Sequence, residues 1–425
     1  MWQSIADPEI RSRGWGLVQD IERCLVEYLS EGSGETPDSL LAGGDAGLAL
    51  FFAYLGAARE EGSEDAAGRA LDALGRSAQG LSQARLLPSL YSGFCGVGWV
   101  VEHLTRELFE GDVDLSAEID EGLRRLLTDP GSVPYELISG LAGFGTYLVE
   151  RLPHPDAVEL LGRILDLLEA SAEESEDGVT WYTTPEWLVP WQRELMPSGC
   201  YNLGVAHGVP GVLGFLAAAQ REGLQDSRLE RLAEGVVRWL LGRKLPGVEG
   251  SALPAFYVPG QEPEPARTAW CYGDLGVSAV LLSAARSFGR PEWEREAFDL
   301  ARLAARRPFE AAKAIDTTLC HGTAGIAHLF NRFHQATGDP EMKEAALAWY
   351  RRTLDLRHPD EERFAGLLTW ASPGPGEGIW QGEPGFLTGI AGTGLALLAA
   401  LTEVEPAWDR VMLVATPSDP APGQP

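Results

Sequence analysis

Two potential metal ligands stand side by side in this sequence, at Cys320 and His321. They come directly before a Gly-x-x-Gly motif, which is followed by an apolar run with the length of a helix. Cys271 stands two residues before the first glycine of another such motif, as Cys320 does. His207 stands one residue before the first glycine of a third, as His321 does. Three repeats therefore offer two thiols and two imidazoles at equivalent helix starts.

Two cysteines and one histidine suit a tetrahedral Zn²⁺ whose fourth position is left for water or substrate. His207 could instead supply a fourth protein ligand, and the sequence leaves that alternative open. We favour the open site because a chain of this size does not need a zinc ion to hold it together. Two thiolates already balance the charge of Zn²⁺, so a third thiolate from a substrate would stay strongly nucleophilic. The residues therefore indicate a centre that activates substrate thiols.

The composition limits the partners of this protein. Its 425 residues include 34 Lys plus Arg and 62 Asp plus Glu, which gives a formal net charge of −28. Such a charge repels phosphate backbones and anionic membrane surfaces, which argues against a nucleic-acid-binding function. We find neither a signal peptide nor an apolar run of membrane-spanning length, so we expect a cytoplasmic protein without membrane insertion. The five cysteines are too sparse for a disulfide framework.

A Gly-x-x-Gly motif followed by an apolar run occurs seven times. The runs are apolar on all sides, which predicts buried helices, and amphipathic segments with charged faces lie between them. These alternations predict an all-α fold, an α/α toroid (barrel) of seven inner and seven outer helices. The first and last inner segments are as apolar as the middle ones, which favours a closed ring. The first glycines of the motifs are Gly44, Gly93, Gly140, Gly208, Gly273, Gly322 and Gly389.

We expect glycine at each inner-helix start for two reasons, a positive φ and the close approach of neighbouring backbone. In such a toroid the inner helices run the same way, so their N-termini and partial positive charges meet at one mouth. Residues just before the glycines share that mouth although they are far apart in the sequence. Thiols in such a place have a pKa below the usual value of about 8.5 and are good ligands or nucleophiles.

Three stretches carry a resemblance to a known family: Tyr201-Asn-Leu-Gly-Val-Ala-His-Gly-Val-Pro-Gly211, Arg267-Thr-Ala-Trp-Cys-Tyr-Gly273 and Leu319-Cys-His-Gly-Thr-Ala-Gly325. Over about residues 15 to 400 the chain resembles the lanthionine synthetase C (LanC) family, the cyclases of lanthipeptide and lantibiotic biosynthesis. The resemblance implies the toroid fold and a zinc ion bound by Cys271, Cys320 and His321. It also implies the addition of peptide cysteine thiols to dehydroalanine or dehydrobutyrine, which forms lanthionine or methyllanthionine thioether rings.

The resemblance has implications for partners and for domain organisation. No kinase-like or dehydratase segment is evident, so the chain resembles the stand-alone cyclase, which takes a dehydrated precursor peptide and works with a separate dehydratase and transporter. We expect one toroid domain over residues 1–414 and a disordered tail at 415–425. Insertions near 173–203 and 245–266 interrupt the repeat and contain glycine, proline and aromatic residues. They are candidates for gripping the substrate peptide.

Four further residues are candidates for the chemistry. His207, Arg267 and Tyr272 match the family's other active-site positions, and His207 is the natural donor of a proton to the α-carbon. Arg267 could hold the carbonyl where negative charge develops, and Tyr272 could donate a hydrogen bond. Alternatively, Arg267 pairs with an inner carboxylate and Tyr272 only packs. Glu136 stands four residues before the third Gly-x-x-Gly, where the family usually has Asp, and we expect it to orient His207 or Arg267.

Four other classes of protein compete with this interpretation. Protein prenyltransferase β-subunits also combine a toroid, zinc and a thiol substrate, but their zinc ligands include a carboxylate, unlike the pair Cys320 and His321. A glycosidase would need two central carboxylates, such as Glu136 and Asp274, and would leave the cysteines unexplained. A LanC-like protein that binds or adds glutathione, or a non-catalytic scaffold of a biosynthetic complex, stays open. Zinc content and an assay with a dehydrated peptide separate these alternatives.

Overall fold

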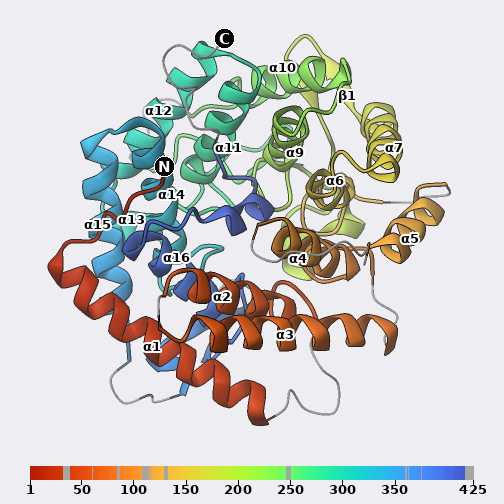
Figure 1. Ribbon diagram of the computed structural model, residues 1–425. Coiled ribbons are helices and arrows are strands. Elements are labelled where there is room, and N and C mark those ends of the chain that lie inside the picture. Colours follow the sequence, from red (N-terminus) through yellow and green to blue (C-terminus); the bar gives the residue numbers. More distant parts are fainter. Residues whose placement is uncertain are drawn as a thin grey trace, which may run out of the picture.

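The computed structural model describes residues 1–31, 39–59, 61–83, 87–107, 114, 116–128, 133–245, 250–358, 361, 363–374 and 376–416. Within these ranges seven inner helices are surrounded by seven outer ones (Figure 1). The inner helices are α2 (Asp45–Ala57), α4 (Phe94–Glu107), α6 (Leu141–Glu150), α9 (Val209–Arg221), α11 (Asp274–Ser287), α14 (Thr323–Thr337) and α16 (Ile390–Leu401). The outer helices are α1 (Pro8–Glu31), α3 (Ser63–Gln83), α5 (Ala117–Thr128), α7 (Pro155–Ser171), α10 (Arg228–Leu241), α12 (Pro291–Ala305) and α15 (Pro340–Asp355). The fold is the predicted α/α toroid.

The two rings follow from the sequence pattern. Inner helix α2 is buried from Asp45 to Gly56 and α16 from Ile390 to Leu401, because both are apolar on every side. The outer helix α10 buries one stripe at helical spacing and turns its charged face to solvent. The last inner helix, α16, packs against both α1 and α2, so the ring closes on itself as predicted.

A ring of backbone hydrogen bonds joins the seven loops that precede the inner helices. In each loop the residue involved stands two positions before the first glycine of the motif. Six links connect neighbouring repeats, with N···O distances of 2.9 to 3.5 Å. In the described part of the chain no backbone bond closes the seventh link, where the N–H of Ile138 instead donates to the side chain of Glu136. The seven residues are Ala42, Tyr91, Ile138, Ala206, Cys271, Cys320 and Leu387.

Close backbone approach explains the glycines of these loops better than positive φ does. A Cβ on Gly322 would lie 2.1 Å from the backbone nitrogen of Thr318, which no side chain tolerates. The positive φ that we expected at every inner-helix start is found only at Gly273, with φ 107°, among the first glycines that the structure describes. That expectation was wrong because the other loops enter their helices through extended backbone, as Gly140 does at φ −120°.

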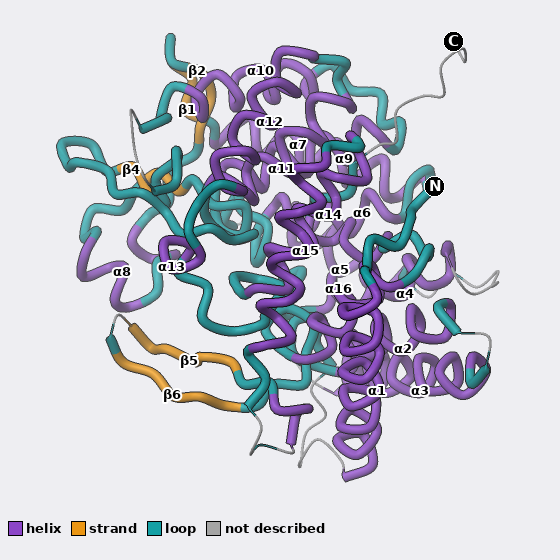
Figure 2. The backbone as a smooth tube through the Cα atoms, turned by 90° about the vertical axis from the view of Figure 1, so that its left-hand side faces the viewer, coloured by secondary structure: helices purple, strands orange, loops and turns teal. Residues whose placement is uncertain are grey.

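Three inserted segments lie on the mouth side of the toroid, at the left of Figure 2. The 173–203 segment contains strands and short helices, and the second predicted insertion contributes one strand, which pairs with the first segment. A third insertion, which we did not predict, forms the hairpin β5–β6 after a short 3₁₀ helix. Their elements are β1 (Glu173–Ser175), β2 (Gly178–Thr180), η1 (Pro185–Trp187), α8 (Pro190–Leu195), β3 (Tyr201–Asn202), β4 (Phe256–Tyr257), η2 (Arg363–Gly366), β5 (Thr369–Gly374) and β6 (Glu377–Gln381). The short helix α13 (Phe309–Ala312) lies between α12 and α14.

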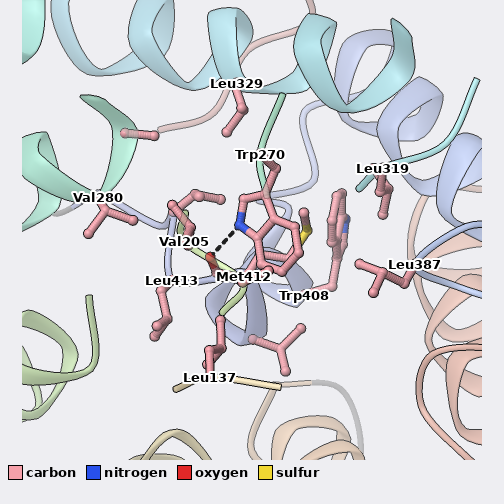
Figure 3. Close-up of a cluster of buried hydrophobic side chains, with 14 of the residues drawn as sticks. Leu137, Val205, Trp270, Val280, Leu319, Leu329, Leu387, Trp408, Met412 and Leu413 are labelled. Carbon is pink, nitrogen blue, oxygen red and sulfur yellow. Dashed lines mark hydrogen bonds between the residues drawn. The ribbon is translucent and has the colours of Figure 1, made fainter. Parts of the chain in front are cut away.

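The C-terminal segment fills the lumen of the toroid. It contains η3 (Ala407–Met412), and its side chains pack among those of several inner helices and loops (Figure 3). The indole Nε1 of Trp270 donates to the carbonyl of Met412 at 2.9 Å, and the hydroxyl of Tyr91 donates to the carbonyl of Val411 at 3.0 Å. Both donors belong to mouth loops, so the lumen core supports the floor of the mouth.

The tail that we expected to be disordered begins within this ordered segment. The carbonyl of Ala415 accepts hydrogen bonds from Ser283 and Arg221, whereas residues 417–425 lie outside the described ranges. In the part of the chain that the structure describes, no helix is long and apolar enough to cross a membrane.

Candidate metal centre

Cys271, Cys320 and His321 meet at the mouth of the toroid. One potential ligand atom from each lies within 4.8 Å of those of the other two. Cys271 ends the loop before α11, and the other two end the loop before α14. The backbone ring holds these loops together, because the N–H of Cys271 donates to the carbonyl of Cys320 at 3.2 Å. Residues 50 positions apart in the chain are thereby placed around one point.

Hydrogen bonds among the three side chains shift their pKa values in a way that suits metal binding. A hydrogen bond from the Cys320 thiol, with a second from His321, holds the pKa of Cys271 well below its usual range against the opposing effect of burial. The same hydrogen bond, together with burial, raises the pKa of Cys320. Burial would lower the pKa of His321, but the hydrogen bond to Cys271 and the charge of that sulfur raise it. Of the two thiols, Cys271 is therefore the one that loses its proton more readily.

This donor set fits Zn²⁺. Two sulfurs and one imidazole are ligands that zinc prefers, and three protein ligands leave a position open for a substrate. His207 is not in the cluster, so its ligand atom does not lie within 4.8 Å of those of all three residues. The geometry therefore favours Cys271, Cys320 and His321 as the residues that would hold the ion.

Asp316 is a residue of this site that sequence reasoning missed. Its side chain is fully buried, and its Oδ1 accepts hydrogen bonds from the backbone N–H and the hydroxyl of Thr318 at 3.1 and 2.9 Å. Its Oδ2 lies 3.6 Å from Nε2 of His321. The carboxylate therefore braces the loop and faces the imidazole that would bind metal. A signal was available, because Asp316 stands six residues before Gly322, as Arg267 stands six before Gly273.

Glu136 and His207 form a tight pair between the two mouth loops that precede the Cys271 loop in the ring. Oε2 of Glu136 lies 2.7 Å from Nδ1 of His207. The two carboxylate oxygens also accept the backbone N–H groups of Ile138 and Ser139, at 3.1 and 2.6 Å. Partial desolvation by the surrounding protein would lower the pKa of His207, but Glu136 and the Cys271 sulfur raise it above its usual value. The side chain of His207 remains 50% exposed, so it is accessible from the mouth.

The structure places Arg267 and Tyr272 beside the cluster. Arg267 lines the cleft, and among the residues described it has no hydrogen-bond or ion-pair partner. The inner carboxylate of Asp274 is instead paired with Arg307, which argues against the alternative that Arg267 pairs with it. The hydroxyl of Tyr272 accepts a hydrogen bond from Nδ2 of Asn202 at 3.1 Å, and burial raises the pKa of Tyr272. Its ring packs on Phe256 with 5.3 Å between centroids. Asn202 is a second positioning group that we did not predict.

A cleft of about 570 Å³ leads from solvent to the cluster. Its floor includes Cys271, His321 and Asp316, and its walls come from the three inserted segments and the loop after α13. The walls are largely aromatic or aliphatic, with two cationic side chains. The wall residues include Trp191, Gln192, Ala255, Phe256, Arg267, Tyr272, Lys313, Ile315, Trp370, Ser372, Gly374 and Gly376.

The remaining cysteines contrast with those of the cluster. Burial raises the pKa of Cys200 to about 12 and that of Cys95 well above its usual range. Cys24 lies on the outer helix α1, away from the mouth loops. Burial thus disfavours the thiolate form of Cys95 and Cys200, and Cys24 lies outside the mouth.

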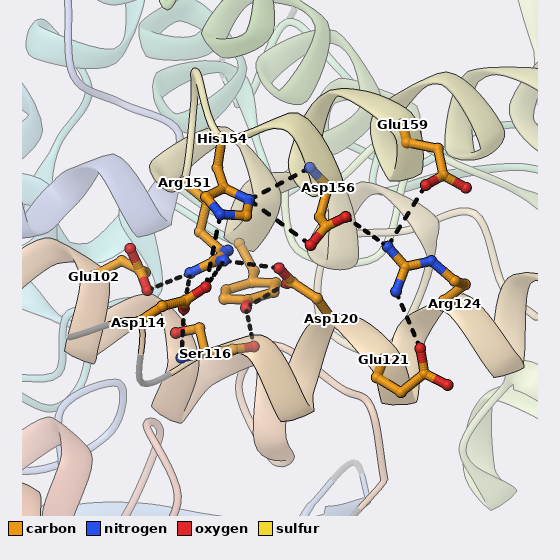
Figure 4. A network of polar contacts seen from close by, with 11 residues as sticks. Glu102, Asp114, Ser116, Asp120, Glu121, Arg124, Arg151, His154, Asp156 and Glu159 are labelled. Atoms are coloured by element: carbon orange, nitrogen blue, oxygen red, sulfur yellow. Dashed lines mark hydrogen bonds and ion pairs between the residues drawn. The ribbon is translucent and has the colours of Figure 1, made fainter.

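A second group of potential ligands, Asp120, His154 and Asp156, is explained by ion pairs (Figure 4). Arg151 lies 2.9 Å from Oδ2 of Asp120, and Arg124 lies 2.9 Å from Oδ1 of Asp156. Because guanidinium groups already balance both carboxylates, this group ties α5 to α7 rather than forming a metal site.

Comparisons with known proteins support the fold and show the family. A family model described as "Lanthionine synthetase C-like protein" matches residues 35–413. The nisin biosynthesis protein NisC of Lactococcus lactis subsp. lactis is 26% identical over 269 residues, which span 58% of this chain and 62% of that protein. The glutathione S-transferase LANCL1 of Danio rerio is 26% identical over 321 residues, 70% of each chain. The solved structure of nisin cyclase matches with a TM-score of 0.76 and 20% identity, over 93% of this chain and 97% of that one.

Proposed function

Because this chain belongs to the lanthionine synthetase C-like family, we propose that it is a zinc-dependent lanthipeptide cyclase. It adds the cysteine thiols of a dehydrated precursor peptide to dehydroalanine or dehydrobutyrine and forms lanthionine or methyllanthionine rings. The observation that carries the proposal is the meeting of Cys271, Cys320 and His321 at the mouth of the toroid, where Cys271 and His321 line a cleft of about 570 Å³. When bound there, zinc would lower the pKa of the peptide thiol and hold it as a thiolate.

His207 supplies the proton that completes the addition. A sulfur–carbon bond forms at the β-carbon of the dehydro residue, the electrons of its double bond move toward the carbonyl oxygen, and the α-carbon then takes a proton. Nδ1 of His207 is hydrogen-bonded to Glu136, which leaves Nε2 to deliver that proton. The raised pKa of His207 favours the protonated form that a donor needs.

Arg267 and Tyr272 stabilise the charge that develops on the substrate. The guanidinium lines the cleft and is free to bind the carbonyl oxygen where negative charge accumulates. Asn202 fixes the hydroxyl of Tyr272, so Tyr272 can donate its own hydrogen to the same region. Because burial raises its pKa, Tyr272 remains a neutral donor.

The proposal implies particular partners. The substrate must first lose water from serine or threonine, so a separate dehydratase acts before this protein, and a transporter for the finished peptide acts after it. We place these steps in the cytoplasm, where cysteines remain reduced. The dehydration step follows from the proposed reaction, whereas the transporter and the location are proposed from the family resemblance.

A second candidate function is the addition of glutathione, which the name of the Danio rerio relative supports. The same cluster would activate the glutathione thiol, and the arrangement of His207 and Arg267 would serve either reaction. The two functions differ only in which thiol reaches the cleft.

One experiment separates the two. The zinc-loaded protein is incubated with a dehydrated peptide that contains one cysteine and one dehydroalanine, with and without glutathione. Cyclisation leaves the mass unchanged and protects the cysteine from alkylation, whereas glutathione addition raises the mass by one glutathione. A peptide that keeps its mass and stays fully alkylatable, as it should with Cys320→Ala, would contradict both functions.

A further inference from the structure

The hairpin β5–β6 carries two tryptophans on one face. Trp370 is paired with Trp380 in the antiparallel register, and Ala371 is paired with Ile379. Directly opposite residues of an antiparallel pair lie on the same face, and successive residues alternate between faces. The two indoles therefore share one face, whereas Ile379 lies on the other. Figure 2 shows the hairpin projecting beside α8 and α13 on the mouth side.

The tryptophan face is continuous with the cleft above the metal cluster. Trp370, Ser372 and Gly374 all line the cleft, although the pairing of β5 with β6 is irregular between Ala371 and Gly374. The indoles of Trp370 and Trp380 touch edge to face, with 5.3 Å between centroids. Trp380 is 43% exposed although it is a large apolar residue. The tryptophan face thus begins inside the cleft at Trp370 and continues beyond it into solvent at Trp380.

Hydrogen bonds fix the position of the tryptophan face relative to the Cys271, Cys320 and His321 cluster. The N–H of Trp370 donates to Oδ2 of Asp316 at 3.5 Å, and that oxygen also faces His321. At the base of β5 the hydroxyl of Thr369 donates to the carbonyl of Thr388 at 2.6 Å. One carboxylate is therefore shared between the candidate metal ligand and the strand that bears the wall.

Gly378 allows Trp370 to lie across the neighbouring strand. A Cβ at Gly378 would come within 2.5 Å of Cε2 of the Trp370 indole. Any side chain at position 378 must therefore push the ring out of its place. The glycine preserves a flat aromatic surface.

We propose that the Trp370–Trp380 face is the docking wall for the substrate peptide, and that it binds apolar residues next to the reacting cysteine. The inference rests on the proposed cyclase function. Its support is the continuity of the face with the cleft, because a peptide whose cysteine reaches the cluster must extend its neighbouring residues along this wall. Two indoles suit an extended chain rather than a globular partner, and exposed tryptophans are frequent anchors of binding energy. The wall selects the peptide segment and takes no part in bond formation.

The test compares two adjacent residues on opposite faces of β6. Trp380→Ala removes the exposed indole, whereas Ile379→Ala, at a residue 64% exposed, is the matched control. The probe is a fluorescein-labelled peptide with one cysteine, one dehydroalanine and a leucine on each side of the cysteine. We expect Trp380→Ala to weaken binding by the full-length zinc-loaded protein roughly tenfold in fluorescence anisotropy, a typical effect of losing an aromatic anchor. Ile379→Ala should bind as the unaltered protein does.

A second probe and a second variant make the test specific. With glycine in place of both leucines, the peptide should bind the unaltered protein about as weakly as the leucine peptide binds Trp380→Ala, and Trp380→Ala should weaken it little further. Gly378→Ala, which displaces Trp370, should also weaken binding of the leucine peptide. In turnover the loss should appear in KM rather than kcat, with zinc content unchanged.

The outcomes for the wall and for the function are distinct. Equal binding by Trp380→Ala and the unaltered protein, an equal loss with Ile379→Ala, or no binding of either peptide would overturn the docking wall. If the unaltered protein closes the ring while Trp380→Ala keeps its KM, only the wall fails. If the peptide binds with the expected pattern but is never cyclised, the wall stands and the cyclase proposal fails.

Discussion

Glu136 holds His207 at the place where the backbone ring of the toroid is interrupted. Oε2 of Glu136 lies 2.7 Å from Nδ1 of His207 and also accepts the N–H of Ile138 at 3.1 Å. That N–H has lost the backbone acceptor that its counterparts in the other repeats use. The Glu136 carboxylate therefore replaces the missing backbone acceptor of Ile138 and orients the imidazole of His207.

Glu136→Gln should slow cyclisation by about tenfold or more without loss of zinc, the usual scale for a residue that orients a catalytic group. Glu136 accepts hydrogen bonds with both oxygens, whereas glutamine offers only one. Glu136→Asp keeps the charge and both acceptors and should be largely tolerated. Rates of ring closure at saturating peptide, together with zinc content, check this prediction.

The same variant should change the pH profile in a known direction. The Glu136 charge is the larger of the effects that raise the pKa of His207, so removing it lowers that pKa. If His207 donates as the protonated form, activity is lost as pH rises through its pKa. The alkaline fall in kcat should therefore occur at lower pH in Glu136→Gln. Unchanged turnover with an unchanged profile would show that the carboxylate is only structural.

Removing any of the three candidate ligands should remove zinc. We expect about one Zn²⁺ per chain in the unaltered protein and loss of the ion in Cys271→Ala, Cys320→Ala and His321→Ala, with the helical circular dichroism retained. His207→Ala is the contrasting variant, which should keep zinc but lose enzyme-directed ring closure. Metal analysis after gel filtration checks both results. Zinc loss in His207→Ala would make it a fourth ligand and contradict the open site.

Asp316→Asn should weaken zinc binding about 10- to 100-fold, because a carboxylate facing a metal-binding imidazole orients it and increases its basicity. Asparagine can still accept the hydrogen bonds from Thr318, so the loop should stay folded. Competition with a chromophoric chelator gives the affinity without relying on enzyme activity. Asp299→Asn on the exposed face of α12 is the control. Equal zinc affinities of Asp316→Asn and the unaltered protein would show that Asp316 only stabilises its loop and does not orient His321.

The repeat pattern was sufficient to predict the toroid and the meeting of distant residues. Cys271, Cys320 and His321 could be placed at one mouth because each stands at a fixed distance before a glycine of the same motif. That argument depends only on the position of each residue within its repeat. In a closed ring, residues at equivalent positions of neighbouring repeats lie close together. The prediction therefore needed no knowledge of side-chain contacts.

The parts that escaped prediction depend on contacts that register does not describe. Asp316, Asn202 and Arg267 occupy the same position of their repeats, but they are three different residue types. Only the hydrogen bonds of Asp316 and Asn202 show that both help to position the site. The hairpin β5–β6 was missed because Ser-Pro-Gly-Pro-Gly-Glu-Gly, between its tryptophans, is typical of a loop. Its strands are held by anchoring to the mouth loops rather than by strong intrinsic preference.

The lumen contains a buried ion pair that should make stability depend on pH. Asp409 is fully buried, with Oδ2 2.6 Å from Nε of Arg332 and 2.7 Å from Nε2 of His328. Burial alone would raise the pKa of Asp409, but the charge of Arg332 and the hydrogen bond with His328 lower it. Asp409→Asn leaves the Arg332 charge poorly balanced, so it should cost about 3–5 kcal/mol of unfolding free energy at pH 7.

The sign of the pH dependence distinguishes this pair from simple packing. Because the pKa of Asp409 is lower in the folded state, its contribution is complete above the unfolded value of about 3.9 and is lost as pH falls further. The difference in urea midpoint between Asp409→Asn and the unaltered protein should therefore narrow on acidification below about pH 4. Glu405→Gln is the matched control, since Glu405 also contacts Arg332, at 2.6 Å, but is 55% exposed. It should change stability by about 1 kcal/mol or less. A difference for Asp409→Asn that stays constant across this pH range would mean that lost packing, rather than lost charge, destabilises the variant.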